Sequence, residues 1–157
     1  MPENIITETV SFRANGDTAD GYLAYPSGSD KCPIVIVIQE WWGLNDNIKD
    51  IANRIAAEGY VALAPDLYHG EIATEPDLAQ KLMMALVQEQ AVKDLNGAVA
   101  ALQARNDVVS DKIGTTGFCM GGGLALLLHM SNSDVKASAP FYGVPMGDLA
   151  NVSKIQG

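Results

Sequence analysis

Hydrophobic residues recur along the chain with two periods, one typical of strands and one typical of helices. Residues 34–38 form an uninterrupted β-branched run, Ile-Val-Ile-Val-Ile, which indicates a strand covered on both faces. In residues 48–55 apolar side chains recur at i, i+3, i+4 and i+7, which predicts an amphipathic helix capped by Asn45 or Asp46. Residues 60–64 then form a short apolar strand. The three segments predict a βαβ unit with a right-handed crossover.

The rest of the chain continues this alternation of strands and helices. Further strands are predicted at residues 5–12, 22–25, 112–117 and 135–142. Further helices are predicted at residues 76–87, 89–105 and 124–130. Because no repeat or linker interrupts the pattern, we expect a single domain over residues 1–157. Alternating strands and helices predict an α/β fold, a three-layer sandwich around a mostly parallel sheet.

The charge balance narrows the range of partners. The 157 residues carry 10 Lys and Arg against 19 Asp and Glu, a formal net charge of −9. Because nucleic acids are bound by clustered cations, this balance argues against a nucleic-acid partner. The longest apolar runs are far below the roughly 20 residues of a membrane span, so no membrane partner is expected.

The cysteines and the N-terminus indicate a compartment. No basic region followed by an apolar one, as in a secretory signal, begins the sequence. Cys32 and Cys119 show no metal-like spacing, and we find no spacing that implies a metal or an organic cofactor. A disulfide between the two stays open at this point. The expectation is a cytoplasmic protein with reduced cysteines.

The candidate nucleophile is Cys119, in the sequence Gly-Phe-Cys-Met-Gly at residues 117–121. This is a G-x-C-x-G form of the nucleophile elbow, and it lies between a predicted strand and a predicted helix. Glycines flank the cysteine because side chains would collide in the strained turn, and the helix N-terminus favours a thiolate. The alternatives are a cysteine buried as a small hydrophobe and a dinucleotide-binding loop, whose third position would be glycine.

A second candidate is Glu40, which follows the apolar strand 34–38. The carboxyl ends of strands are where α/β sheets build their sites. The alternative is a carboxylate that simply returns to solvent where the strand ends.

Three further motifs accompany the elbow. They are Gln-Glu-Trp-Trp-Gly-Leu-Asn at 39–45, Ala-Pro-Asp-Leu-Tyr at 64–68 and Phe-Tyr-Gly-Val at 141–144. Together with the elbow they resemble the dienelactone hydrolase family, α/β-hydrolases with a cysteine nucleophile. The resemblance runs from about residue 20 onward. It implies an α/β-hydrolase sandwich and a small-molecule substrate, a lactone or carboxylic ester, that is cleaved through a thioester on Cys119.

The resemblance also implies roles for individual residues. Glu40 would contact the thiol of Cys119 and tune its ionisation. The backbone N–H groups of Met120 and Trp41 would form the oxyanion hole, whose fixed donors are usually a large catalytic contribution. Three aromatic residues are interpreted as walls of the substrate pocket: Trp42, Tyr68 and Tyr142.

Compared with the family, this sequence lacks the strands that would carry two catalytic residues. Family members continue beyond the last strand predicted here into strands that carry the triad Asp and His. The resemblance therefore implies a sheet without its last strands, a domain incomplete at its C-terminus and impaired turnover. His129 lies nearly three helical turns from the elbow and is interpreted as a packed or surface helix residue. His69, at the correct edge of the sheet, is the one histidine that could reach the site, and it is interpreted as a solvated or substrate-adjacent loop residue, with a role as the base left as the alternative.

These absences leave a second function open. A non-catalytic α/β module or fragment could pair with a partner chain, or with a second copy, through the open sheet edge at residues 135–142. The resemblance also bears on the substrate, because family members that use anionic substrates hold the charge with arginines. Only Arg13, Arg54 and Arg105 are present here, and the last two fall on outer helix faces. Lys81, the nearest other cation, is interpreted as a solvated helix residue. A general ester or lactone hydrolase is therefore favoured over a dienelactone-specific one.

Overall fold

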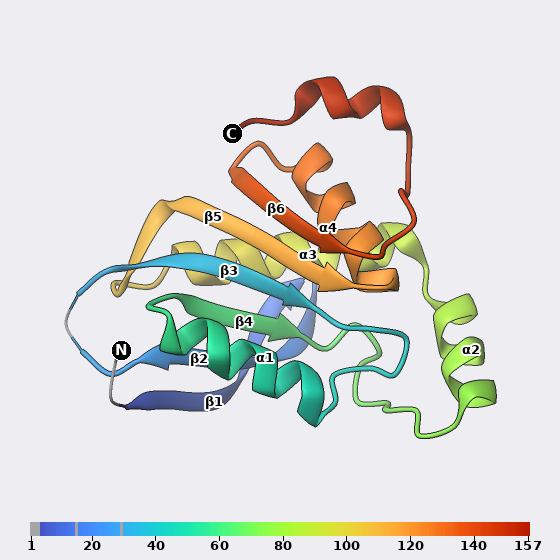
Figure 1. Ribbon diagram of the computed structural model, residues 1–157, viewed down its shortest axis with the longest axis horizontal. Helices are drawn as coiled ribbons and strands as arrows, with labels where there is room; N and C mark the ends of the chain where they lie inside the picture. The colour runs from blue at the N-terminus through green and yellow to red at the C-terminus, as the bar shows by residue number, and fades with distance from the viewer. Residues whose placement is uncertain (1–3, 15, 29) are drawn as a thin grey trace.

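The computed structural model describes residues 4–14, 16–28 and 30–157. The elements run β1 (Ile5–Ala14), β2 (Asp17–Pro26), β3 (Cys32–Ile38), α1 (Asp46–Ala57), β4 (Val61–Pro65), α2 (Pro76–Ala85), α3 (Gln88–Gln103), β5 (Val108–Phe118), α4 (Met120–Ser131), β6 (Val135–Phe141) and the 3₁₀ helix η1 (Leu149–Lys154). Figure 1 shows one twisted sheet with α1 on its near side and α3 and α4 behind it. The predicted α/β architecture is confirmed.

The sheet has six strands in the order β1-β2-β4-β3-β5-β6. Strands β3, β4, β5 and β6 are parallel to one another, whereas β1 and β2 form an antiparallel hairpin that joins the sheet through β4. The apolar run of β3 is central because both of its faces are covered: Ile36 and Val37 are each fully buried.

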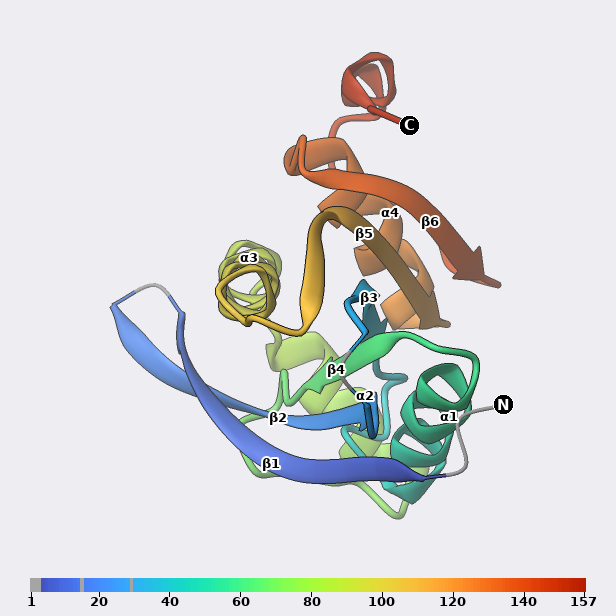
Figure 2. The same ribbon diagram turned by 90° about the vertical axis from the view of Figure 1, so that its left-hand side faces the viewer.

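Helices cover the two faces of the sheet unequally. Residues such as Ile36 and Leu63 pack with Leu95 of α3 and Leu124 of α4 on one face. On the other face the smaller core contains Val37 and lies under α1, which packs on β1 to β4. Figure 2 shows α1 and α3 on opposite sides of the strands. The middle of the sheet is therefore a three-layer sandwich.

Helix α4 begins at Met120, four residues before the predicted start at residue 124. Glycines at 121–123 have low helix propensity and hid this first turn from the sequence pattern. The structure requires them for packing: a Cβ at Gly121 would lie 2.3 Å from the carbonyl oxygen of Gln39, and one at Gly122 would lie 2.6 Å from that of Phe141. Strand β5 also begins earlier than predicted, at Val108.

The last strand, β6, is an edge of the sheet and pairs with β5. A groove of about 530 Å³ runs over β3, β5 and β6 on the face that carries α1, with Gly114, Thr116, Ala137 and Ala139 among its lining residues. The 3₁₀ helix η1 packs on α4, and Gly157 comes beside Lys136 near the start of β6. No helix within the described residues is long and apolar enough to cross a bilayer.

A bidentate ion pair holds the turn between α3 and β5. Arg105 donates to Asp107 from Nε at 2.8 Å and from Nη2 at 2.6 Å, and its guanidinium carbon lies 4.6 Å from the centre of the Tyr25 ring. Hydrogen bonding from Arg105 lowers the pKa of Asp107 below its usual 3.8. The stabilisation by this pair is therefore fully present above pH 3.8 and is lost as the pH falls through the lower folded-state pKa.

Asp107→Asn should accordingly lower the free energy of unfolding by about 1 kcal/mol near pH 6, since the pair is partly exposed. The loss should shrink at a pH well below 3.8, as the pH falls through the lowered pKa and the parent carboxylate is also being protonated. Urea unfolding of the parent and of Asp107→Asn, at pH 6 and at the lower pH, measures the difference in the free energy of unfolding. An equal loss at both pH values would contradict this role of the carboxylate charge.

Candidate active site

Cys119 lies in a strained turn between β5 and α4. Its φ of 55° and ψ of −120° place a non-glycine residue in the left-handed region. Its N–H donates to the carbonyl of Phe141 at 3.1 Å, which ties the turn to the end of β6. A Cβ at Gly117 would lie 2.1 Å from the carbonyl oxygen of Gly121, so glycine is required there. The strained turn predicted from the G-x-C-x-G spacing is present.

The thiol stands at the N-terminus of α4. Cys119 is the N-cap of this twelve-residue helix, and its carbonyl accepts from Gly122 at 3.0 Å and from Gly123 at 3.3 Å. Met120, predicted to supply one oxyanion-hole N–H, is the first residue of α4 and is 6% exposed.

Glu40 and Trp41 lie in the turn that follows β3. The N–H of Gly43 donates to the Glu40 carbonyl at 3.2 Å, and the turn brings Trp41 and Trp42 into an edge-to-face contact with ring centres 5.3 Å apart. Gln39, directly before Glu40, is fully buried and accepts from the N–H of Leu67 at 3.1 Å. This bond joins the ends of β3 and β4, so the turn is anchored where the predicted site lies.

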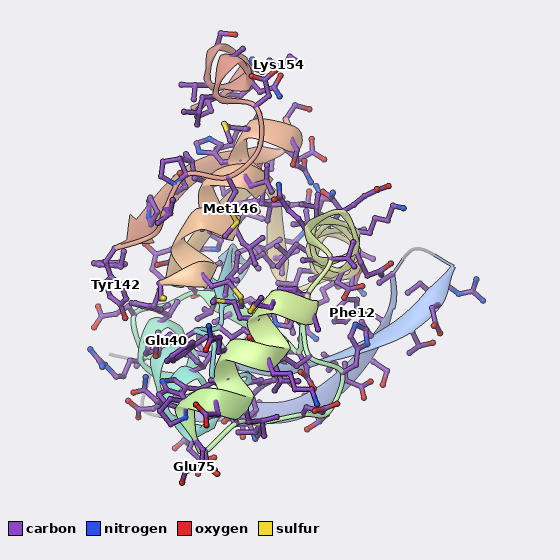
Figure 3. The ribbon with its side chains drawn as sticks, turned by 90° about the vertical axis from the view of Figure 1, so that its right-hand side faces the viewer. Phe12, Glu40, Glu75, Tyr142, Met146 and Lys154 are labelled. Atoms are coloured by element: carbon purple, nitrogen blue, oxygen red, sulfur yellow. The ribbon has the colours of Figure 1, made fainter. Side chains whose placement is uncertain are left out.

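Tyr142 is hydrogen-bonded to Glu40. Its hydroxyl donates to Glu40 Oε2 at 3.0 Å, and Figure 3 shows the two residues on the same edge of the molecule. Although Tyr142 is 70% exposed, slight desolvation raises its pKa, and the hydrogen bond to Glu40 together with the negative charges of Glu40 and Cys119 raises it further. The sequence had indicated Tyr142 only as a pocket wall. The structure brings Cys119, Glu40 and Tyr142 into one cluster.

A cavity of about 260 Å³ opens beside Cys119. It is lined by Met83, Leu86, Gln88, Cys119, Met120, Leu124, Tyr142, Val144 and Met146. Of the three aromatic residues predicted as pocket walls, Tyr142 belongs to this lining, whereas Trp42 and Tyr68 do not. Sequence reasoning missed the residues from the end of α2 and from the loop after β6, whose apolar side chains follow no pattern specific to a site.

Tyr68 lies behind the cavity. Its hydroxyl contacts the sulfur of Met120 at 3.8 Å, and it lines a neighbouring hollow of about 290 Å³. Burial, with a smaller contribution from the charge of Cys119, raises the pKa of Tyr68 to about 12. Tyr68 is therefore a neutral hydroxyl over the physiological range and packs beneath the elbow. Asp66 caps this loop, as its oxygens accept from the N–H groups of Tyr68 and Gly70.

Both histidines form hydrogen bonds with residues that do not line the cavity. His69 Nε2 lies 2.8 Å from Oδ2 of the buried Asp94. His129 is 6% exposed, with Nδ1 at 2.8 Å from Ser138 Oγ and Nε2 at 3.0 Å from the carbonyl oxygen of Gln156. The interpretation of His129 as a packed helix residue is confirmed. Neither histidine is part of the cavity lining within the described residues.

The two cysteines are free thiols, which resolves the disulfide left open by the sequence. Burial raises the pKa of Cys32, and the nearby Asp107 and Asp30 raise it further. Cys32 is thus less often a thiolate than an ordinary cysteine. Over the residues that the structure describes, no three or more His, Cys, Asp or Glu side chains are grouped to hold a metal ion.

Comparisons with known proteins identify the family and the fold. The family model "Dienelactone hydrolase family" matches residues 19–157. A relative from Aquifex aeolicus described as "Putative carboxymethylenebutenolidase" is 37% identical over 156 residues, 95% of this chain. One with the same description from Escherichia coli K12 is 37% identical over 150 residues, 92% of this chain. The crystal structure of "Putative Dienelactone Hydrolase" from Klebsiella pneumoniae superposes with a TM-score of 0.83 at 32% identity over 93% of this chain.

This chain is shorter than those proteins. It spans 67% of the Aquifex aeolicus relative, 55% of the Escherichia coli relative and 63% of the Klebsiella pneumoniae chain. The matched part includes the elbow, Glu40 and Tyr142, because the family model reaches to residue 157.

Proposed function

This chain belongs to the dienelactone hydrolase family, and we propose that it is a carboxylic ester hydrolase that attacks a lactone or ester carbonyl with the sulfur of Cys119. The observation that carries the proposal is the position of this thiol, held in a strained turn at a helix N-terminus and open to a cavity. A sulfur in such a position is accessible to a substrate carbonyl, which nucleophilic catalysis requires.

The first step forms a thioester. The thiolate of Cys119 adds to the carbonyl carbon, and the carbonyl oxygen takes the negative charge. We assign the donors to this oxyanion to the backbone N–H groups of Met120 and Trp41, which lie at the start of α4 and in the turn after β3. Collapse of the intermediate breaks the C–O bond, and the alkoxide takes a proton from water as it leaves.

The second step is hydrolysis of the thioester, which returns the thiol and releases the acid. Water attacks faster when a base removes its proton. Since neither described histidine lines the cavity, the base is not supplied by an imidazole of this part of the chain. We therefore expect acylation to outpace deacylation, so that the acyl-enzyme accumulates.

Mixing the protein with p-nitrophenyl acetate should release a burst of about one p-nitrophenolate per Cys119, with the acetyl group found on that residue by mass spectrometry. Cys119→Ala should abolish the burst. Cys32→Ala is the matched control and should retain it, because Cys32 lies at the start of β3 and its thiol is bonded to the carbonyl of Asp30. A burst that survives Cys119→Ala would rule out the proposed nucleophile.

A second candidate function is association of two copies through β6. This strand is an edge of the sheet and is exposed from Lys136 onward, apart from the half-buried Ser138. Its sequence, Val-Lys-Ala-Ser-Ala-Pro-Phe, contains no acidic residue, although the chain has a net charge of −9. No acidic side chain of β6 itself would therefore repel the β6 strand of a second copy. Pro140 lacks an N–H, which limits the pairing to the residues before it.

A further inference from the structure

We propose that the cavity beside Cys119 selects uncharged esters or lactones with an apolar acyl group and rejects those that carry a carboxylate. The inference rests on the proposed function, because it names the substrate class of the same site.

The first observation is the chemistry of the lining. Met83 and Leu86 reach the cavity from the end of α2, Leu124 from α4, and Val144 and Met146 from the loop after β6. Figure 3 shows Met146 and Tyr142 placed on the same side of the molecule. A lining of this kind gains free energy by removing apolar surface from water, and thioethers adapt to irregular chains.

The second observation is where the cations lie. All ten Lys and Arg side chains belong to the described residues, and none is among those lining the cavity. Several are engaged elsewhere: Arg105 with Asp107, Lys93 with Glu89, and Lys136 with the carbonyl of Ser133. The neutral polar groups in the lining are the amide of Gln88 and the hydroxyl of Tyr142.

The third observation is the sign of the local charge. Tyr142, which is part of the lining, donates its hydroxyl hydrogen to the carboxylate of Glu40. That hydrogen is therefore already donated to one anion, and a second carboxylate bound in the cavity would find neither this donor nor a lysine or arginine among the lining residues. An unpaired charge removed from water is costly, and a net charge of −9 adds long-range repulsion.

Labelling of Cys119 measures this selectivity without any need for turnover. In a Cys32→Ala protein, n-butyl methanethiosulfonate and 2-carboxyethyl methanethiosulfonate each form a mixed disulfide with Cys119 and release methanesulfinate. With rates normalised to those of 2-mercaptoethanol, we expect the neutral reagent to be faster by about tenfold or more, which corresponds to about 1.4 kcal/mol. Equal normalised rates would overturn the inference.

A charge placed in the lining should reverse the preference. Val144→Lys introduces a cation at a position that is 75% exposed, and it should raise the rate of the anionic reagent relative to the neutral one by about tenfold. Val152→Lys, on η1 outside the lining, makes the same change in net charge and is the matched control. If both variants shift the ratio equally, the selectivity comes from the overall field and the cavity is not its source.

Esters separate this inference from the proposed function. We expect a faster burst with p-nitrophenyl butyrate than with mono-p-nitrophenyl succinate, again by about tenfold. If both esters acylate Cys119 equally well, the hydrolase proposal stands and the selectivity is wrong. If neither ester acylates Cys119 while the labelling preference holds, the hydrolase proposal fails and the cavity is an apolar binding site.

Discussion

Gly117→Ala is expected to collapse the nucleophile turn, whereas Gly114→Ala, three residues earlier in the same strand, should be tolerated. A Cβ at Gly117 would lie 2.1 Å from the carbonyl oxygen of Gly121 and 2.4 Å from its carbonyl carbon. Both are backbone atoms of the first turn of α4, so no side-chain rotation relieves the contact. The start of the helix must move, and we expect a loss of about 3 kcal/mol or more in the free energy of unfolding.

The control position leaves space for the new methyl group. A Cβ at Gly114 would lie 3.8 Å from the carbonyl oxygen of Ala137 and 3.9 Å from that of Ile34, which are ordinary contacts. Alanine also restricts the unfolded chain more than glycine does, so the stability should change by less than about 1 kcal/mol.

Urea unfolding and the p-nitrophenyl acetate burst together measure the effect. Gly117→Ala should lose both stability and the burst, because displacement of α4 moves the N–H of Met120 and the thiol of Cys119. Gly114→Ala should keep both. Similar stability and bursts in the two variants would mean that the turn does not depend on the absence of a side chain at residue 117.

The elbow could be predicted from the sequence because its constraint is local. Gly117 packs against the backbone of Gly121, and Gly121 packs against the backbone at the end of β3. Both contacts require glycine, so the spacing of the two glycines around the cysteine is enough to predict the turn. The bond between Glu40 and Tyr142 could not be predicted in this way, as the two residues are 102 positions apart. Their meeting depends on the parallel alignment of β3, β5 and β6, which places the ends of these strands together.

The cavity lining illustrates the same limit. Met83 and Leu86 fit the apolar stripe of a helix packed on the core, and both do pack against it. Nothing in their spacing distinguishes a side chain that also faces Cys119. Val144 and Met146 lie in an irregular loop, where no periodic pattern exists to be interpreted. Helices and strands could be predicted because their buried side chains recur at a regular spacing along the chain. The site is formed largely by loops, and this spacing does not determine the path of a loop.

Ala139→Lys, on the exposed strand β6, is expected to prevent the association of two copies. Ala137 and Ala139 share the α1 side of the sheet with Gly114 and Thr116, their partners on β5, and all four line the groove of about 530 Å³. Small side chains leave this edge flat, and a flat edge with unpaired backbone groups is a template for another strand.

A lysine at residue 139 acts against pairing in two ways. In an antiparallel pair of two β6 strands related by a two-fold axis it places one lysine of each copy on the same face of the joined sheet, and both ammonium groups must be desolvated as the copies meet. By sedimentation velocity over a range of concentrations, the parent should shift toward dimer while Ala139→Lys remains monomeric. Ala150→Lys, an exposed position on η1, is the matched control and should behave as the parent does. A parent that stays monomeric at every concentration would show that Pro140 and Lys136 already protect the edge, and the second candidate function would then be discarded.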